Sequence, residues 1–327
     1  MRLLMLGGTH FVGRAVTEEA LARGWQVTTF NRGRTEPPPG VSTLIGDRTG
    51  DLSALENGEW DVVVDTWSGA PTIVRDAANL LSGRAAQYIY VSSRSVHPFP
   101  TPPNATEDAP VVDGSPDAGE VGYAEDKRGG ELAAEQAFGD RALFVRAGLI
   151  LGPYEDIGRL PWWLNRMARG GPVLAPAPAD SGLQYIDVRD LATWTVDAAE
   201  QKLGGPYNMV STPGHTTMRE LLEACISVTG SDAELRWTDP DAILAAGVEP
   251  WSNLPVWLPQ GELYDTLHMG NVDKALATGL RCRPVQETVA DTWAWLQTLG
   301  GQAPQRPDRP PVGLDPDLEA KVLAQHS

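Results

Sequence analysis

The start of the chain places a glycine-rich turn directly between an apolar run and a helical pattern. Residues 2–6 (RLLML) form the apolar run, and residues 7–13 (GGTHFVG) follow at once. From Phe11 to Arg23 apolar residues recur at helical spacing, and Gly24 ends the pattern. A buried strand that turns tightly into a helix presents backbone N–H groups and a positive dipole end to a phosphate. The chain is therefore constrained to begin as a strand-turn-helix unit that can hold an anion.

The same alternation of strands and helices continues along the first half of the chain. Apolar runs typical of buried strands lie at residues 26–30, 41–45, 61–65, 87–92 and 142–151, and helical patterns lie at about residues 71–81 and 123–138. Continuous apolar strands separated by helices favour a parallel sheet that is covered on both faces. We therefore predict an α/β fold, a Rossmann-type doubly wound parallel sheet with a smaller C-terminal substrate lobe.

Changes in composition suggest how the chain is divided into domains. We assign residues 1–155 to a nucleotide-binding core, with residues 183–230 returning to it. The Trp-, Gly- and Pro-rich residues 156–182 and 231–300 are assigned to the substrate lobe, and residues 301–327 to a Pro-rich tail on the surface.

Two further segments carry local signals. Residues 98–122 are rich in Pro, Asp and Gly and lack any period, which is typical of a long surface loop with a functional role. Thr217 and Glu220 have the spacing of a capping box, which predicts a helix that ends before Gly230.

Composition limits the partners and the compartment. The formal net charge of −17 argues against a nucleic-acid partner, because affinity for a phosphate backbone depends on basic side chains. Cys225 and Cys282 show no CxxC spacing, and no metal site is expected from the histidines at positions 10, 97, 215, 268 and 326. The first apolar run is too short for a signal peptide, and no apolar stretch is long enough to span a membrane. We expect a cytoplasmic protein that acts on a small molecule, without a membrane partner.

The glycine-rich turn supplies the first candidate cofactor-binding residues. Glycine lets the backbone turn tightly and come close to a pyrophosphate. We assign this role to the turn and its flanks, namely to Gly7, Thr9, His10, Phe11, Val12 and Gly13. His10 either donates a hydrogen bond to a phosphate or is a solvent-facing histidine at the start of the helix.

The residues after the second apolar run indicate which dinucleotide is bound. A site that prefers NAD ends its second strand with a carboxylate that accepts a hydrogen bond from the ribose 2′-OH. Here the run continues as Asn31-Arg32-Gly33-Arg34, which contains no acid and two guanidinium groups. Arginine binds a 2′-phosphate by charge-assisted, often bidentate hydrogen bonds. We therefore predict NADP(H), bound by Asn31, Arg32 and Arg34, with Arg32 as the first ligand of the phosphate. The alternative is an ordinary basic turn.

A tyrosine and a lysine four residues apart are the first candidates for catalysis. On a helix, Tyr123 and Lys127 lie on the same face, so that an ammonium group stands beside a phenol. A nearby positive charge favours the phenolate and brings the pKa of a tyrosine toward the working pH. The pair can therefore pass a proton to or from a substrate oxygen.

Taken in order, these motifs resemble those of the extended short-chain dehydrogenases/reductases, the NAD-dependent epimerase/dehydratase family. That family carries G-x-x-G-x-x-G at its phosphate turn. Gly7 and Gly13 occupy the outer places and His10 the middle one, as in the atypical GGT-x-F-x-G branch. Residues 145–153 (VRAGLILGP) are similar to the sixth strand of the family and the loop beneath the nicotinamide. Residues 185–192 (YIDVRDLA) are similar to its F-I-H-V-x-D-L-A segment.

The resemblance implies a catalytic set. Residues 92–97 (SSRSVH) resemble the S-S-x-x-V-Y motif of the family, whose serine bonds the substrate oxygen and the tyrosine. The register puts that serine at Ser93, with Ser92 and Ser95 as weaker candidates. The resemblance gives Tyr123 the proton transfer, and it gives Lys127 both the tuning of Tyr123 and the binding of the cofactor ribose.

The resemblance also points to residues around the cofactor and the substrate. Asp47, in the sequence GDR, resembles the acid of the family that meets the adenine amino group, or it is a turn residue. Trp67 and His97 follow the fourth and fifth strands and should border the nicotinamide end. Trp162 and Tyr185 could line an aromatic pocket for a ring or a sugar, although a place in the core is the better interpretation for either one alone.

Three functions remain open from the sequence. The first is an NADP(H)-dependent oxidoreductase that reduces or oxidises a small-molecule carbonyl or secondary alcohol by hydride transfer. The second is a nucleotide-sugar epimerase or dehydratase with tightly held NAD(P). The third is a non-catalytic nucleotide- or RNA-binding relative, because some relatives of the GGT-x-F-x-G branch bind RNA stem-loops. Members of the family often dimerise through a four-helix contact, so the resemblance also implies a homodimer.

Overall fold

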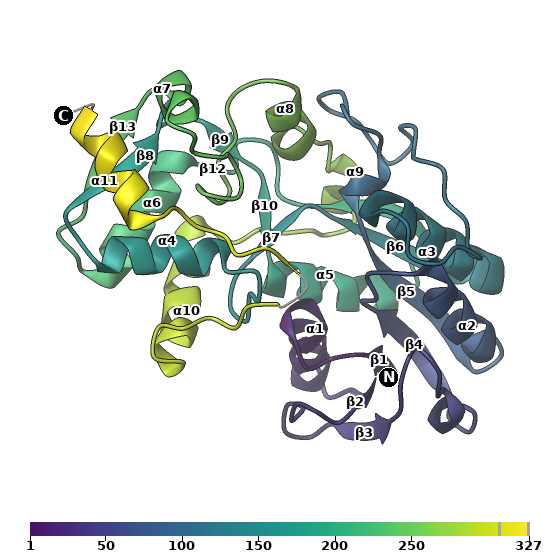
Figure 1. The fold of residues 1–327 in the computed structure, drawn as a ribbon. Helices are drawn as coiled ribbons and strands as arrows, with labels where there is room; N and C mark the ends of the chain where they lie inside the picture. Colours follow the sequence, from purple (N-terminus) through teal and green to yellow (C-terminus); the bar gives the residue numbers. More distant parts are fainter. Residues whose placement is uncertain (307–308, 326–327) are drawn as a thin grey trace. The chain divides into compact units, whose positions relative to one another are not determined.

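The structure is a computed structural model and describes residues 1–306 and 309–325. It divides the chain into two compact units, whose elements are drawn in Figure 1. Unit 1 consists of Met1–Gly148, Val188–Val210 and Asn271–Arg281. Unit 2 consists of Leu149–Asp187, Ser211–Gly270 and the described residues from Cys282 onward.

Unit 1 is built on a seven-stranded sheet in which every neighbouring pair is parallel. Its strands are β1 (Arg2–Leu6), β2 (Gln26–Asn31), β3 (Ser42–Ile45), β4 (Trp60–Asp65), β5 (Ala85–Ser93), β6 (Ala142–Ala147) and β11 (Gly205–Met209). The spatial order is β11-β6-β5-β4-β1-β2-β3 (Figure 1). The order reverses between β1 and β4, which is the switch point beside which doubly wound sheets bind their ligands. The predicted α/β, Rossmann-type fold is confirmed.

Helices cover both faces of this sheet. They are α1 (Phe11–Ala22), α2 (Pro71–Leu81), α3 (Tyr123–Phe138), α5 (Val188–Glu200) and the short α9 (Asp273–Ala277), with single 3₁₀ turns η1 (Ser53–Leu55), η2 (Arg94–Val96) and η3 (Gly139–Arg141). The helices α2 and α3 pack on each other and share a core with one face of the sheet, while α1 packs on α5. Among the described helices, none has the length and apolarity needed to cross a membrane.

The segment expected as one strand over residues 142–151 is interrupted at Gly148. A Cβ atom at Gly148 would lie 2.8 Å from Cγ2 of Val210. Its backbone N–H donates to the carbonyl of Met209 at 3.1 Å. The strand β6 therefore ends in unit 1, and β7 (Leu149–Leu151) pairs with β10 (Tyr185–Asp187) in unit 2. The prediction of a single strand was wrong because the backbone of Gly148 packs on Val210, which is far away in the sequence. A local apolar pattern does not reveal such a contact.

Unit 2 combines three two-stranded sheets with helices around a Trp-rich core. Besides β7 and β10 it contains α4 (Arg159–Ala168), β8 (Pro172–Pro176), β9 (Gly182–Leu183), β12 (Thr216–Thr217), α6 (Met218–Thr229), β13 (Glu234–Thr238), α7 (Pro240–Ala245), α8 (Glu262–His268), α10 (Val285–Thr298) and α11 (Pro316–Gln325). The predicted capping box is confirmed, since Thr217 and Glu220 bond each other's backbone N–H groups at the start of α6. The helix ends at Thr229, before Gly230, as expected.

The division into units differs from the expected domains. Residues 149–155, 183–187 and 211–230, expected in the nucleotide-binding core, lie in unit 2, and residues 271–281, expected in the substrate lobe, lie in unit 1. Lys274 explains the second difference, because its ammonium donates to the carbonyl of Pro206 and lies over the ring of Tyr207, 4.2 Å from its centroid.

The expected tail over residues 301–327 contains the helix α11, which is anchored in unit 2. Glu319 of this helix is buried and accepts a hydrogen bond from Nε of Arg166 in α4 at 2.7 Å. The backbone N–H of Leu174 also donates to Glu319 at 3.1 Å. A buried ion pair with a strand contact fixes this end of the chain, which composition alone did not indicate. Residues 307–308 and 326–327 of the expected tail lie outside the described residues.

A buried carboxylate holds the start of α4. The two carboxylate oxygens of Glu155 accept the N–H groups of Arg159 at 2.7 Å and of Leu160 at 3.2 Å. The residue before the helix, Gly158, has a left-handed φ of 91° and no side chain that could cap these groups. Burial raises the pKa of Glu155 to about 7, although the charge of Arg159 and the two amide hydrogen bonds favour the carboxylate.

We predict that Glu155→Gln changes how stability depends on pH. Because the pKa of Glu155 rises from 4.5 to about 7 on folding, the folded protein binds this proton more tightly than the unfolded chain does. The group therefore lowers stability as the pH rises through that window. The free energy of unfolding of the wild type, minus that of the variant, should fall by about 3 kcal/mol between about pH 4 and about pH 8. Urea denaturation at both pH values measures this difference, and a difference that does not change with pH would contradict the prediction.

Candidate active site

The glycine-rich turn after β1 has the close packing expected of a phosphate-binding turn. Gly7 and Gly8 have left-handed φ values of 112° and 91°. A Cβ atom at Gly8 would lie 2.8 Å from Cγ2 of Thr29, and one at Gly13 would lie 2.9 Å from the backbone nitrogen of Gly8. The turn can therefore close only with glycine at both places. Gly8 had not been assigned a role from the sequence, although its neighbour in the motif had.

The first turn of α1 can receive an anion. Within the described chain no side chain caps this helix and no acidic residue lies in its first turn. Phe11 begins the helix at a strained φ of 32°, and Val12 is buried behind it, while Thr9 is half-buried. Exposed His10 is the N-cap residue, and its Nε2 lies 3.4 Å from the hydroxyl of Thr35. The N–H groups and dipole of this helix end match the requirements of a pyrophosphate.

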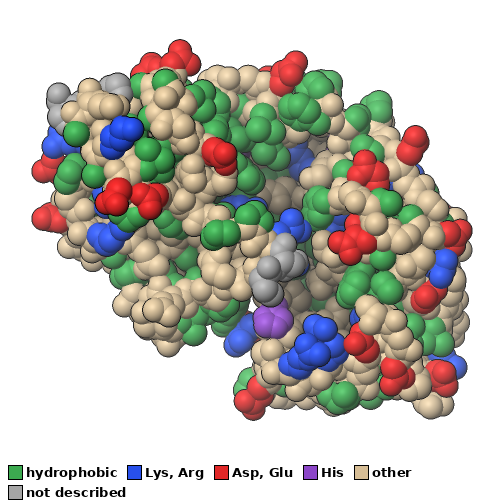
Figure 2. Space-filling view, viewed as in Figure 1, with side chains coloured by type: hydrophobic (Ala, Val, Ile, Leu, Met, Phe, Trp, Pro, Cys, Tyr) green, Lys and Arg blue, Asp and Glu red, His purple; other side chains and the backbone are tan. Residues whose placement is uncertain are grey.

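The end of β2 carries the basic turn. The side-chain oxygen of Asn31 accepts the N–H of Gly33 at 2.7 Å, which is an Asx turn, and Gly33 takes a left-handed φ of 68°. Arg32 and Arg34 are both exposed on this turn. Figure 2 shows Lys and Arg side chains gathered beside a histidine over the part of unit 1 that contains α1, β2 and β3. Asn31 thus shapes the turn that presents the two guanidinium groups.

Asp47 lies beside the same basic turn. Its carboxylate accepts the backbone N–H and the hydroxyl of Thr49 at 3.0 and 2.8 Å. These two hydrogen bonds, followed by the charges of Arg32 and Arg34, lower the pKa of Asp47. The sequence left Asp47 as a cofactor ligand or a turn residue. The structure shows the turn, and it also shows that Asp47 is near the two candidate phosphate ligands.

The serines at the end of β5 point to opposite faces of the sheet. Ser92 donates to the buried carboxylate of Glu131 at 2.7 Å, and Arg146 binds the same carboxylate with two hydrogen bonds of 2.9 and 3.0 Å. Ser93 ends the strand, and its hydroxyl accepts the N–H of Ser95 at 3.1 Å, which caps η2. Ser92 is therefore part of a buried network, and Ser93 keeps the place assigned to the catalytic serine.

Lys127 lies at the carboxyl ends of two neighbouring strands. Its side chain is 4% exposed, and its ammonium donates to the backbone carbonyls of Trp67 and Val91, each at 2.7 Å. The ammonium also lies 4.8 Å from the centroid of the Tyr90 ring. Val91 is only two residues before Ser93. The lysine is therefore fixed at the sheet edge where β4 and β5 end.

Tyr123 begins α3, one helical turn before Lys127, and is 44% exposed. The pKa of Tyr90 is raised by burial, by the charge of Asp65 and then by that of Tyr123. Tyr123 is thus near the ring that lies beneath the Lys127 ammonium. A solvent-accessible phenol near a buried ammonium has the components needed for proton transfer to a substrate oxygen.

Trp67 and His97 contribute differently from what the sequence suggested. The half-buried indole of Trp67 donates to the carbonyl of Ala70 at 3.2 Å, and its backbone carbonyl binds Lys127. Nδ1 of His97 lies 2.9 Å from the carbonyl of Pro110, so Nδ1 carries the proton. Burial lowers the pKa of His97, and the side chain packs under the loop of residues 98–122. That loop contains no described helix or strand, as predicted.

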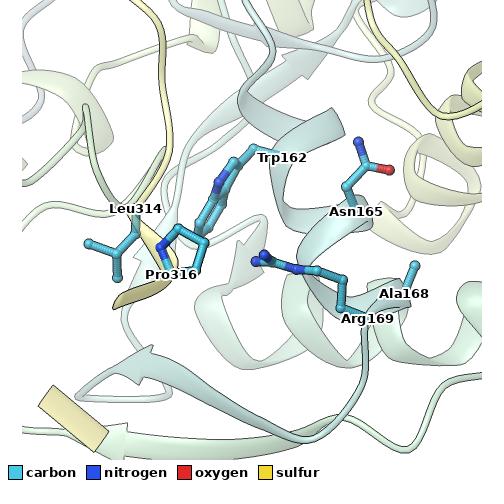
Figure 3. A pocket seen from close by; sticks show the side chains of 6 residues that line it. All are labelled: Trp162, Asn165, Ala168, Arg169, Leu314 and Pro316. Carbon is cyan, nitrogen blue, oxygen red and sulfur yellow. The ribbon is translucent and has the colours of Figure 1, made fainter. Parts of the chain in front are cut away.

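The other two candidate substrate residues lie in unit 2. Tyr185 is buried in β10, with its ring edge-on to His215 at 5.7 Å between centroids. Trp162 lines a pocket of about 520 Å³ on α4 and the segment before α11, whose lining residues are Trp162, Asn165, Ala168, Arg169, Leu314 and Pro316. Figure 3 shows the guanidinium of Arg169 turned toward the indole of Trp162. Ser93, Tyr123, Lys127 and Trp67 belong to unit 1, so the structure does not gather all of the candidate residues in one unit.

Comparison with known proteins bears on this geometry. The profile of the NAD dependent epimerase/dehydratase family matches residues 71–209, which include Ser93, Tyr123 and Lys127. This part of the chain, residues 71–209, is therefore similar to the NAD dependent epimerase/dehydratase family. The resemblance stated from the sequence is confirmed.

Two curated relatives share part of their sequence with this chain. The chain is 29% identical over 264 residues to "Epimerase family protein SDR39U1" of Bos taurus, covering 71% of this chain and 82% of that protein. It is 28% identical over 255 residues to "Chloroplast stem-loop binding protein of 41 kDa b" of Arabidopsis thaliana, covering 70% of this chain. The match spans 63% of the length of the stem-loop binding protein.

Solved structures share the fold of this chain. The enzyme WbmH of Bordetella bronchiseptica, solved with NAD⁺, is 17% identical and superposes with a TM-score of 0.64, covering 91% of this chain and 99% of that one. The UDP-glucose 4-epimerase of Thermus thermophilus, solved with NAD, is 22% identical with a TM-score of 0.61 and the same coverage.

Proposed function

We propose that the chain is an NADP(H)-dependent oxidoreductase that transfers hydride to or from a small-molecule carbonyl or secondary alcohol. The observation that carries the proposal is the position of Lys127, which lies one helical turn after Tyr123 and bonds the strand end that leads to Ser93. The proposed substrate is a small molecule and not RNA, which is supported by the net charge of −17.

Each residue of the proposed site has a role that suits its position. The free N–H groups at the start of α1 bind the pyrophosphate, and Lys127 binds the nicotinamide ribose. The bound nicotinamide supplies or accepts the hydride. In the reducing direction Ser93 donates a hydrogen bond to the carbonyl oxygen, and Tyr123 transfers its proton to that oxygen. The Lys127 ammonium stabilises the phenolate that forms, which solvent then reprotonates.

The choice of NADP(H) over NAD(H) is supported by the turn after β2. Arg32 and Arg34 are exposed on a turn that Asn31 shapes, and no carboxylate ends this strand. A carboxylate there would accept from a 2′-OH and repel a 2′-phosphate, whereas guanidinium groups bind the phosphate. The named structural neighbours were solved with NAD. The proposed preference for NADP(H) is therefore based on this chain's own residues and not on those neighbours.

We predict that NADPH raises the melting temperature more than NADH does, and that Arg32→Ala removes most of the difference. Loss of a charge-assisted hydrogen bond to the 2′-phosphate should weaken NADPH binding about tenfold or more and leave NADH binding unchanged. Arg2→Ala is the matched control, because it removes the same charge from the opposite end of β1, where Arg2 pairs with Asp61. Stabilisation by NADH alone would overturn the assignment of NADP(H).

We also predict that Tyr123→Phe greatly slows hydride transfer without preventing cofactor binding. Oxidation of NADPH in the presence of a panel of small aldehydes and ketones identifies a usable substrate. With that substrate, loss of the proton donor should lower turnover by about 10²-fold or more, while the affinity for NADPH stays within about twofold. Full turnover by the variant would show that Tyr123 is not the proton donor.

A second candidate function is epimerisation or dehydration of a nucleotide sugar. It is favoured by the family profile and by the relative named as an epimerase family protein. In such a reaction the hydride returns to the substrate, so the cofactor need not leave the protein between turnovers. Denaturing extraction of the purified protein separates the two candidates. Near-stoichiometric release of a nicotinamide dinucleotide would favour the epimerase, and protein purified without bound nucleotide would favour the oxidoreductase.

A further inference from the structure

Two side chains of the candidate site donate hydrogen bonds to the backbone carbonyl group of Trp67. It accepts the Lys127 ammonium at 2.7 Å and the hydroxyl of Tyr90 at 3.1 Å. Trp67 lies in the loop after β4, which ends at Asp65, so the hydrogen bonds between strands do not fix the backbone of Trp67. The position of this carbonyl, and with it that of the ammonium, depends on what fixes the backbone of Trp67.

Asp65 fixes that backbone. This last residue of β4 is fully buried, and its Oδ1 accepts the backbone N–H of Trp67 at 2.9 Å. The same carboxylate accepts two parallel hydrogen bonds of 2.9 Å from the guanidinium of Arg48 and one of 2.6 Å from the hydroxyl of Tyr88. A carboxylate has about four lone-pair sites, so these four donors set its orientation completely.

Arg48 connects this carboxylate to the loop after β3. Besides Asp65, its guanidinium donates to the carbonyl of Ile73 at 3.2 Å and lies 5.5 Å from the centroid of the Trp67 ring. Arg48 therefore acts on Trp67 directly, through the indole ring, and indirectly, through the Asp65 carboxylate that accepts the N–H of Trp67. A lysine at this place could supply the charge but not the planar fork that binds both oxygens.

We propose that Arg48 and Asp65 are positioning residues for Lys127, acting through the backbone of Trp67. The inference rests on the proposed role of Lys127 in binding the cofactor ribose. The side chain of Arg48 is almost fully buried, and its guanidinium donates hydrogen bonds to Asp65 and to the carbonyl of Ile73. If the paired hydrogen bonds between Arg48 and Asp65 are lost, the backbone of Trp67 is no longer held in place. The carbonyl of Trp67 then moves, and the Lys127 ammonium loses one of its two carbonyl acceptors.

A double-mutant cycle tests this inference without requiring a substrate. The dissociation constant of NADPH is measured by fluorescence for the wild type, Arg48→Lys, Lys127→Met and the double variant. We expect Lys127→Met to weaken NADPH binding about tenfold and Arg48→Lys to weaken it about fivefold. In the Lys127→Met background the additional effect of Arg48→Lys should be less than about twofold, because the group through which Arg48 acts is already absent.

If Arg48 had a purely structural role, the four NADPH dissociation constants of the double-mutant cycle would follow a different pattern. Equal weakening by Arg48→Lys in both backgrounds, or no weakening in either, would overturn the inference while leaving the role of Lys127 intact. No effect of Lys127→Met would overturn both the inference and the proposed role of Lys127. Arg166→Lys is the matched control, because it disturbs an equally buried ion pair with Glu319 in unit 2 and should leave NADPH affinity within about twofold of the wild type.

A second variant covers the case in which Arg48→Lys does not fold. Arg48→Met combined with Asp65→Leu replaces the buried ion pair by apolar side chains of similar size, an exchange that often preserves stability. It also removes the acceptor for the N–H of Trp67. The inference predicts weaker NADPH binding that again depends on Lys127, with a normal cooperative unfolding transition. Unchanged NADPH affinity in this folded variant would overturn it.

Discussion

The ammonium of Lys127 lies where β4 and β5 end, and the arrangement of the candidate site follows from how this buried charge is satisfied. Burying a cation is unfavourable unless it is paired or hydrogen-bonded. Here two backbone carbonyls, those of Trp67 and Val91, and the face of the Tyr90 ring surround it. Because the charge must stay at this edge of the sheet, α3 is held over the strand ends. Tyr123, which begins that helix, is thereby placed near the same edge.

Much of the fold of unit 1 could be predicted from the sequence, because local signals and tertiary packing agree there. The central strands β1, β4, β5 and β6 are largely apolar runs that are buried on both faces, and α1, α2 and α3 start at the residues that the periodicity indicated. The prediction failed where non-local contacts decide the structure. Gly148 interrupts a continuous apolar run because it packs on Val210, and α11 is held by the pairing of Glu319 with Arg166. Neither contact leaves a signal in the local sequence.

The candidate site was predicted less completely than the fold. Motif order located Ser93, Tyr123 and Lys127, and the alternation of side chains along β5 explains why Ser92 is bonded to Glu131 instead. The Arg48–Asp65 pair was missed, because its members are 17 residues apart and lie on different elements. The available signal was a carboxylate at the end of an otherwise apolar strand, which must find a partner when it is buried. His97 and Tyr185 were expected near the substrate and are buried in the core of their respective units.

A crystal structure of the protein with bound NADPH tests the central claim most directly. The account predicts that the pyrophosphate lies against the N–H groups at the start of α1, that the 2′-phosphate is bonded by Arg32 or Arg34, and that the Lys127 ammonium is within hydrogen-bond distance of the nicotinamide ribose. A dinucleotide bound with its nicotinamide end away from Lys127, or bound elsewhere on the protein, would contradict the account.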